Sequence, residues 1–201
     1  MALPRSLIPL NAERVSPEEY LRREAEAEFK SEYYDGYIVP LWPQGPNGMA
    51  GGSAAHGVLC TNLILALGAS VRSSGCQLFS SEIRVQRSDA HAHVYPDASV
   101  ACHPEWASQT HGALANPRIV FEVLLPSTER HDRTTKFAIY SAIPSIEAIV
   151  LVSSDLRLVE VYSRHSATAW LREAYESGNV VLPGGITLDL AELYAQVPEL
   201  D

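Results

Sequence analysis

The chain has 201 residues, a formal net charge of −9 and 46% hydrophobic residues, which is enough for one domain with a sizeable core. The acidic balance disfavours tight non-specific binding to nucleic acid, because such binding depends on basic surfaces that displace counterions. No apolar run is expected to span a membrane, and the first residues lack the features of a signal peptide, so we expect a cytoplasmic protein.

The cysteines argue against two kinds of stabilising site. There are three, Cys60, Cys76 and Cys102, an odd number without CxxC spacing. The pattern therefore supports neither a disulfide framework nor a zinc site, and Cys60 is expected to be a core residue of a helix.

The N-terminal third begins with an expected arm over residues 1–15. Ser16 can cap a helix whose first position is Pro17, and this helix is predicted to run to about Ser31. Gly36 then indicates a turn, and residues 37–42 have the composition of a strand.

A long helix is predicted in the middle of the chain. Residues 41–53 are rich in Pro and Gly and indicate a loop, and Ser53 can cap a helix over residues 54–73. His56 falls in the first turn of that helix, where a histidine is usually structural.

The next segment is predicted to be one strand, residues 76–86, which would place Glu82 on a strand. Residues 88–93 indicate a turn, with His91 and His93 as surface residues, because an HxH pair without a third ligand is weak evidence for a metal site.

Two carboxylates stand in apolar, β-branched segments. Asp97 and Glu122 are predicted on two buried strands, separated by a loop over residues 103–116. A buried carboxylate is costly without a partner, and two of them on neighbouring strands repel each other. A divalent cation such as Mg²⁺, which prefers oxygen ligands, is a natural partner for the pair.

Ser127 or Thr128 is expected to cap the next helix, which is predicted to run to about Ala142. It carries Lys136, one of only two lysines among 15 Lys and Arg residues, which suggests that an ammonium group is needed there. The alternative is an ordinary helical ion pair between Asp132 and Lys136, worth about 0.3 kcal/mol.

The C-terminal part is expected to continue with a strand and a hairpin. The order of elements predicts a mixed α/β fold with the two acids on central strands. The predicted elements are a strand over 147–153, a hairpin over 156–164 and 168–175, a turn at 184–185 and a short helix over 189–194. As one domain, 1–201, the chain would comprise the arm 1–15, a core 16–155 and a C-terminal hairpin and helix 156–201.

A set of ordered motifs covers most of the chain. They are Ser16–Tyr20, Glu32–Gly36, Met49–Ser53 with His56, Phe79–Val85, Tyr95–Asp97, Phe121–Leu124, Pro126–Thr128, and Asp132-Arg133 with Lys136 and Tyr140. Together they resemble the Uma-two family of restriction-type endonucleases, within the PD-(D/E)XK nuclease superfamily.

The resemblance implies a restriction-endonuclease-like core, with a mixed central β-sheet flanked by helices and an added C-terminal β-hairpin. It implies a metal-dependent endonuclease acting on nucleic acid, with DNA favoured, and a homodimer. Asp97, Glu122 and the Val123 carbonyl would bind Mg²⁺ or Mn²⁺, and Lys136 would orient a water or stabilise developing charge. The supporting residues implied around them are Glu32, His56, Glu82 and Asp132.

One position departs from the superfamily pattern. Leu124 stands where a lysine is usual, two residues after the glutamate, and Lys136 on the following helix fits the variant in which the lysine has moved. The alternative is a decayed nuclease fold that serves as a homodimeric or nucleic-acid-binding module. A glycosidase is disfavoured, because the sequence has no cluster of Trp or Tyr to line a sugar cleft.

Overall fold

The computed structural model describes residues 13–41, 53–108, 112–198 and 200. The predicted arm and the loop over 41–53 therefore lie almost entirely outside the described residues. The helices are α1 Pro17–Glu26, α2 Ala54–Ser73, α3 Glu129–His131, a π-helical turn Asp132–Lys136, α4 Phe137–Ser141, a 3-10 turn Pro183–Gly185 and α5 Leu190–Leu193. The strands are β1 Ser31–Tyr34, β2 Tyr37–Pro40, β3 Gln77–Ser80, β4 Arg84–Gln86, β5 Ala92–Val94, β6 Ala98–Ala101, β7 Trp106–Ser108, β8 Ala113–Leu114, β9 Ile119–Leu124, β10 Ala148–Ser153, β11 Val159–Arg164, β12 Trp170–Tyr175, β13 Asn179–Leu182 and β14 Ile186–Asp189.

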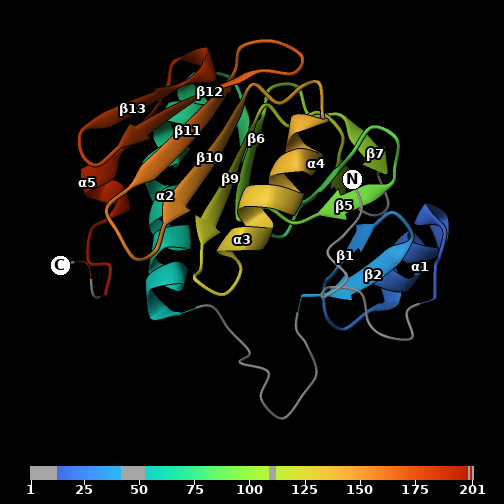
Figure 1. The fold of residues 1–201 in the computed structure, drawn as a ribbon. Coiled ribbons are helices and arrows are strands. Elements are labelled where there is room, and N and C mark those ends of the chain that lie inside the picture. The colour runs from blue at the N-terminus through green and yellow to red at the C-terminus, as the bar shows by residue number, and fades with distance from the viewer. Residues whose placement is uncertain (1–12, 42–52, 109–111, 199, 201) are drawn as a thin grey trace.

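The main sheet has the order β12-β11-β10-β9-β6-β3. Its central strands β9 and β10 are parallel, and the other neighbours are antiparallel, so the sheet is mixed. A second sheet, β2-β1-β5-β4-β8-β7, lies beside it with α1 (Figure 1). The predicted mixed α/β class is confirmed.

Helices cover both faces of the main sheet (Figure 1). Helix α2 lies against one face, where Leu59, Leu63 and Leu67 are fully buried in the larger apolar cluster. The α3–α4 segment lies on the other face, and its Ile139 and Tyr140 join a cluster that includes residues of both sheets. The α3–α4 segment is thus held between the two sheets.

Helix α2 begins and ends where the sequence predicted. Ser53 caps its first turn by accepting a hydrogen bond from the His56 N–H at 3.2 Å. The expectation that no apolar run could span a membrane was wrong for this helix. By length and composition alone, Ala54–Ser73 is apolar enough to cross a membrane. In the fold, however, a stripe of its leucines every fourth residue is packed into the protein core.

The first helix is shorter than predicted and ends at Glu26. The Glu24 carboxylate accepts the N–H of Ser31 at 3.0 Å and its hydroxyl at 2.5 Å, so Ser31 begins strand β1 instead of extending α1. Asp35 and Gly36 then form a tight turn with positive φ angles of 47° and 101°, which suits a two-residue hairpin between β1 and β2.

The segment predicted as one strand over 76–86 is two strands in different sheets. A turn closed by the Ile83 N–H and the Ser80 carbonyl at 3.2 Å separates β3 from β4. The predicted loop over 103–116 likewise contains the short strands β7 and β8. In both places, pairing with distant strands decides the structure more than local composition does.

A disulfide joins Cys76 to Cys102, so the expectation of no disulfide was wrong. The antiparallel pairing of β3 with β6 places Gln77 opposite Ala101, and the two cysteines occupy the next position of the same register. Cys60 is the free cysteine among the three.

The C-terminal part contains two hairpins. Strands β11 and β12 form the predicted one and extend the main sheet beside β10. Strands β13 and β14 form a second, which contacts α2, and Asp189 caps α5 by accepting the Ala191 N–H at 2.8 Å. The predicted added hairpin and final short helix are therefore present.

Candidate active site

Asp97 and Glu122 lie on neighbouring strands near the centre of the main sheet. Glu122 is in β9 and 3% exposed, and Asp97 immediately precedes β6, the antiparallel neighbour of β9. The N–H of Val123 donates to Asp97 Oδ2 at 2.7 Å. The backbone of β9 therefore fixes the Asp97 carboxylate beside the residue that follows Glu122.

Pro96 lies where the hydrogen-bonded ladder between β6 and β9 ends. The register pairs Ala98 with Phe121, and extending it by two residues places Pro96 opposite Val123. The Val123 N–H points toward β6, since it reaches Asp97, and in an extended strand its carbonyl points the same way. Pro96 has no N–H to donate to that carbonyl. The Val123 oxygen is thus open to another partner at the strand end.

Lys136 reaches this region from the π-helical turn. Its Nζ lies 3.1 Å from Glu122 Oε1, 3.5 Å from Glu32 Oε1 and 3.7 Å from Asp132 Oδ1. It also donates to the Tyr95 carbonyl at 3.3 Å. The ammonium group therefore joins three carboxylates with the backbone just before Asp97.

The helical segment presents one polar face to the sheet. Asp132, Lys136 and Tyr140 follow one another at four-residue spacing, and the Tyr140 hydroxyl donates to Glu122 Oε1 at 2.5 Å. Thr128 does not cap the helix as predicted but donates its hydroxyl to Asp132 Oδ2 at 2.9 Å. π-Helical turns such as this one are frequent at functional sites.

Glu32 enters the same cluster from strand β1. It is 2% exposed, and it accepts the Tyr95 N–H at 2.9 Å and the Tyr34 hydroxyl in a short hydrogen bond. His131 Nε2 lies 3.0 Å from the same Tyr34 hydroxyl. Tyr95 is therefore held on its N–H by Glu32 and on its carbonyl by Lys136, which positions the chain that leads to Asp97.

The cluster carries more negative than positive groups. In the described part of the chain, Glu32, Glu122, Asp132 and Asp97 face one ammonium, that of Lys136. Burial, reinforced by the neighbouring carboxylates, raises the pKa of Glu122 well above its usual value and also raises that of Asp132. The arrangement is short of positive charge, which a bound cation would supply.

Asp97 and Lys136 are both held in their charged forms. Burial alone would raise the pKa of Asp97, but the nearby His56 ring, the charge of Lys136 and the hydrogen bond from the Val123 N–H lower it overall. Burial alone would lower the pKa of Lys136, but Glu122, Glu32 and Asp132 raise it well above the usual value. At neutral pH Lys136 is an ammonium ion and cannot accept a proton.

His56 and Cys60 of helix α2 lie on the other side of Asp97. His56 Nε2 is 3.6 Å from Asp97 Oδ1, and Cys60 Sγ is 3.7 Å from His56 Nδ1 and 3.8 Å from Nε2. Burial and the Asp97 carboxylate raise the pKa of the Cys60 thiol, which makes it a poor nucleophile. The side chains of His56 and Asp97 are 20% and 18% exposed, so the site is open to solvent from this side.

Two expectations do not hold at the site, and one does. Glu82 lies in the exposed turn between β3 and β4 and pairs with Lys30 at 2.6 Å, so the fold does not bring it to the cluster. His93 is fully buried in β5 and packs against the rings of Tyr20 and Tyr33, so it is not a surface residue. His91 is exposed, as predicted.

Three arginines of the chain are paired with carboxylates. Arg87 lies 2.7 Å from Asp89, Arg118 lies 3.0 Å from Glu147, and Arg133 lies 2.6 Å from Glu129. These ion pairs consume positive charge that would otherwise be available to a polyanion.

The sequence did not assign Tyr34, Tyr95 or Cys60 to the site. Two local signals were available for them: Tyr34 shares a strand face with Glu32, and Cys60 follows His56 by one helical turn. Tyr95 contributes through its backbone, which no pattern of side chains could indicate.

Comparisons with known proteins agree with this architecture. A family model described as "Putative restriction endonuclease" matches residues 17–193. Two uncharacterized proteins of Synechocystis sp. are similar: slr1290 is 32% identical over 166 residues, 83% of each chain, and sll1609 is 32% identical over 154 residues, 76% of this chain and 82% of that one. A solved structure from Anabaena variabilis, described as "a putative nuclease belonging to DUF820", has a TM-score of 0.66 at 20% identity and covers 90% of this chain and 98% of its own. This last likeness concerns the fold.

Proposed function

The chain belongs to the Uma-two (Uma2) family of restriction-endonuclease-like proteins, and from that premise we propose that it is a metal-dependent endonuclease that hydrolyses phosphodiester bonds in DNA. Asp97 and Glu122 would hold the metal ion, and Lys136 would be the positively charged catalytic residue. The cytoplasmic location and the homodimer stay predictions.

One observation carries the proposal: three residues from distant segments converge at one strand end. Lys136 lies 3.1 Å from Glu122, and Asp97 is hydrogen-bonded to the Val123 N–H that follows Glu122. Burying such a set costs free energy, since each charge loses water. A fold is expected to keep it where the charges perform chemistry.

The residues present fit a Mg²⁺ or Mn²⁺ ion. Asp97 is held ionised, Glu122 shares the ammonium of Lys136 with Glu32 and Asp132, and Pro96 has no N–H to donate to the Val123 carbonyl. These are hard oxygen ligands of the kind that Mg²⁺ prefers, and they would leave its other coordination positions to water and a phosphate. When bound, the ion would polarise the phosphate and lower the pKa of a coordinated water.

Lys136 would act through its charge. Because its pKa is raised, it stays protonated at neutral pH and can donate hydrogen bonds but not accept a proton. It orients Glu122 and would stabilise the negative charge that develops on the phosphate oxygens. Tyr140 holds the second side of the Glu122 carboxylate.

The net negative charge of the chain affects how strongly it is expected to bind DNA. With a net charge of −9 and several arginines used in ion pairs, the protein is expected to bind DNA weakly without metal. Binding should then depend on the ion that Asp97 and Glu122 would hold, because its positive charge would offset the repulsion between the acidic protein and the phosphates.

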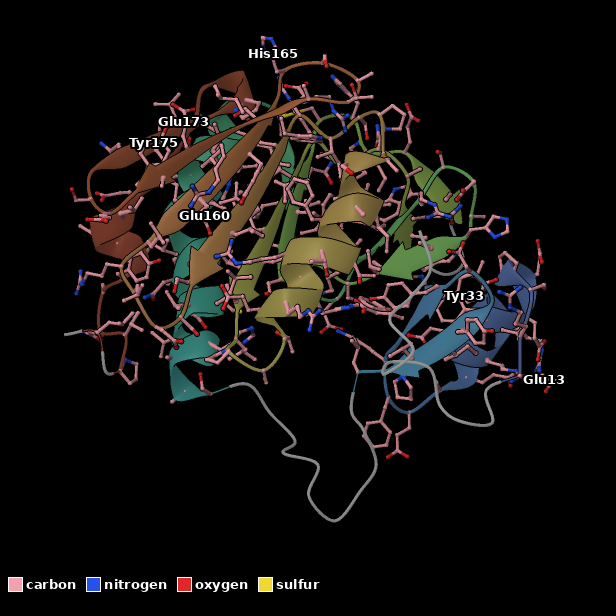
Figure 2. All side chains as sticks on the ribbon, in the orientation of Figure 1. Glu13, Tyr33, Glu160, His165, Glu173 and Tyr175 are labelled. Atoms are coloured by element: carbon pink, nitrogen blue, oxygen red, sulfur yellow. A yellow bond between two sulfur atoms is a disulfide. The ribbon has the colours of Figure 1, made fainter. Side chains whose placement is uncertain are left out.

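The experiment compares two buried glutamates on the same sheet face. Glu122 pairs with Leu151 and Leu151 pairs with Glu160 across the sheet, and the two glutamates are 3% and 2% exposed. Glu160, labelled in Figure 2, is held by Arg133 and by Arg172 instead of by the site. Plasmid, single-stranded DNA and RNA are incubated with Mg²⁺ or Mn²⁺ and wild type, Glu122→Gln or Glu160→Gln.

We expect wild type and Glu160→Gln to cut DNA only with metal, and Glu122→Gln to lose cutting while keeping its melting temperature. Equal cutting by wild type and Glu122→Gln would refute the assignment of the site. No cutting and no metal-induced stabilisation of the wild type would favour the decayed, non-catalytic alternative.

Lys136→Arg is a second probe of the same site. Arginine keeps the charge but replaces a compact ammonium with a planar group that does not fit the same three carboxylates. We expect a large loss of cleavage rate. Full activity in this variant would mean that any positive charge suffices.

A further inference from the structure

Three side chains beside the proposed Mg²⁺ site have a different ligand chemistry. His56 and Cys60 project from consecutive turns of α2, and Asp97 approaches them from the start of β6. One ligand atom from each lies within 4.8 Å of the other two. Nitrogen, sulfur and oxygen together are the donor set of zinc-type sites, not of Mg²⁺.

The distances match those that a tetrahedral ion requires. With typical zinc bond lengths, a nitrogen and a sulfur on one ion are about 3.6 Å apart, and a nitrogen and an oxygen about 3.4 Å. His56 Nε2 lies 3.8 Å from Cys60 Sγ and 3.6 Å from Asp97 Oδ1. Small side-chain movements would therefore bring all three atoms to bonding distance.

The surroundings favour the same conclusion. The Val123 N–H holds Asp97 Oδ2 at 2.7 Å and leaves Oδ1 facing His56, which is the kind of outer hydrogen bond that orients metal ligands. Ser53 caps the turn that carries His56. Both His56 and Asp97 are partly exposed, so an ion can enter from solvent.

We propose that His56 Nε2, Cys60 Sγ and Asp97 Oδ1 form a site for a thiophilic divalent ion of the Zn²⁺ type. Three protein ligands leave a fourth position for water, and the thiol proton is released to solvent when the sulfur binds. The site shares only Asp97 with the proposed Mg²⁺ site and does not depend on nuclease activity.

A cysteine–histidine–aspartate nucleophile is a different use of the same residues. It requires the imidazole to stand between thiol and carboxylate, with one ring nitrogen facing each. Here Cys60 Sγ lies 3.7 Å from Nδ1 and 3.8 Å from Nε2, so neither ring nitrogen is directed at the thiol alone, while Nε2 lies 3.6 Å from Asp97 Oδ1. This geometry suits a shared ion better than a proton relay.

The test titrates metal-free protein with Co²⁺, which gives a near-ultraviolet charge-transfer band when a thiolate coordinates it. The wild type should show the band with one Co²⁺ per chain, and Zn²⁺ but not excess Mg²⁺ should remove it. Cys60→Ser should abolish the band. His56→Gln should weaken Co²⁺ binding by more than the roughly 10–100-fold that loss of an outer-shell partner costs.

Glu122→Gln separates this site from the nuclease site, because it should lose cleavage but keep the Co²⁺ band. Absence of the band from folded wild-type protein at saturating Co²⁺ would overturn the proposal. If the band appears in His56→Gln at an unchanged Co²⁺ affinity, the proposal is also overturned, because Cys60 would then bind Co²⁺ without His56. Circular dichroism on each variant confirms that the fold is retained.

Discussion

Replacing Lys136 with methionine tests the charge balance of the buried cluster. Methionine keeps most of the volume but removes the ammonium that faces Glu122 at 3.1 Å, Glu32 at 3.5 Å and Asp132 at 3.7 Å. Removing one partner of a buried ion pair typically costs about 3–5 kcal/mol. At about 2–4 °C per kcal/mol for a chain of this size, the melting temperature should fall by roughly 6–20 °C.

The cost should depend on pH in a defined direction. The pKa of Lys136 is raised in the fold, so its stabilisation is fully present below the unfolded value of about 10.4 and is lost only as pH rises through the folded value. Glu122 also has a raised pKa, so its contribution favours folding at low pH and is lost as pH rises above about 4.3 toward the folded value. In the variant, acid therefore relieves the uncompensated charge.

Urea unfolding of wild type and Lys136→Met in EDTA at pH 7.5 and pH 5 gives the measurement. The difference in free energy of unfolding should be smaller at pH 5. The double variant Lys136→Met with Glu122→Gln should recover part of the loss, because one partner is then neutral. A cost below about 1 kcal/mol at pH 7.5 would refute the reasoning, since exposed pairs give that value. An equal cost at both pH values would also refute it.

Three further predictions concern the Tyr140 hydrogen bond, the Cys76–Cys102 disulfide and the effect of Mg²⁺ on stability. Tyr140→Phe removes the 2.5 Å hydrogen bond to buried Glu122 and should destabilise the protein by about 1–3 kcal/mol in urea unfolding; a change near zero would show that Glu122 finds another donor. Thiol titration of the denatured, non-reduced protein should find one free thiol, that of Cys60, and reducing the Cys76–Cys102 bridge, which spans 26 residues, should cost roughly 3 kcal/mol; three free thiols would contradict the disulfide. The rise in melting temperature with Mg²⁺ should be larger at pH 8 than at pH 6, because the ion competes with the proton that a raised pKa keeps on Glu122; a larger rise at pH 6 would argue against Glu122 as a ligand.

Local signals in the sequence were reliable where they act over a few residues. Ser53 caps α2, and the helix has the predicted ends, Ala54 and Ser73. Two residue choices pointed to a buried charged cluster. Position 136 carries a lysine in a chain that otherwise favours arginine, and two carboxylates stand within apolar strands. The family motifs added their order along the chain, which the family comparison confirms.

Errors arose where strand pairing overrides composition. An alternating segment over 76–86 is compatible with one strand, yet β3 and β4 join different sheets and leave Glu82 in the turn between them. The same pairing places Cys76 beside Cys102, which cysteine spacing cannot reveal. His93 lies two residues after the exposed His91, but its strand β5 is fully buried.

The sequence by itself predicted the mixed α/β class and the ends of α2, because capping and periodicity are local properties of the chain. The set Asp97, Glu122 and Lys136 was implied by the ordered family motifs, and the fold brings the three residues together. Only the tertiary structure decided that Glu32 lies beside Lys136 while Glu82 stays outside the cluster, and that Cys60 joins His56 next to Asp97. Those contacts join segments tens of residues apart, and their geometry depends on strand register and helix packing, to which every part of the core contributes.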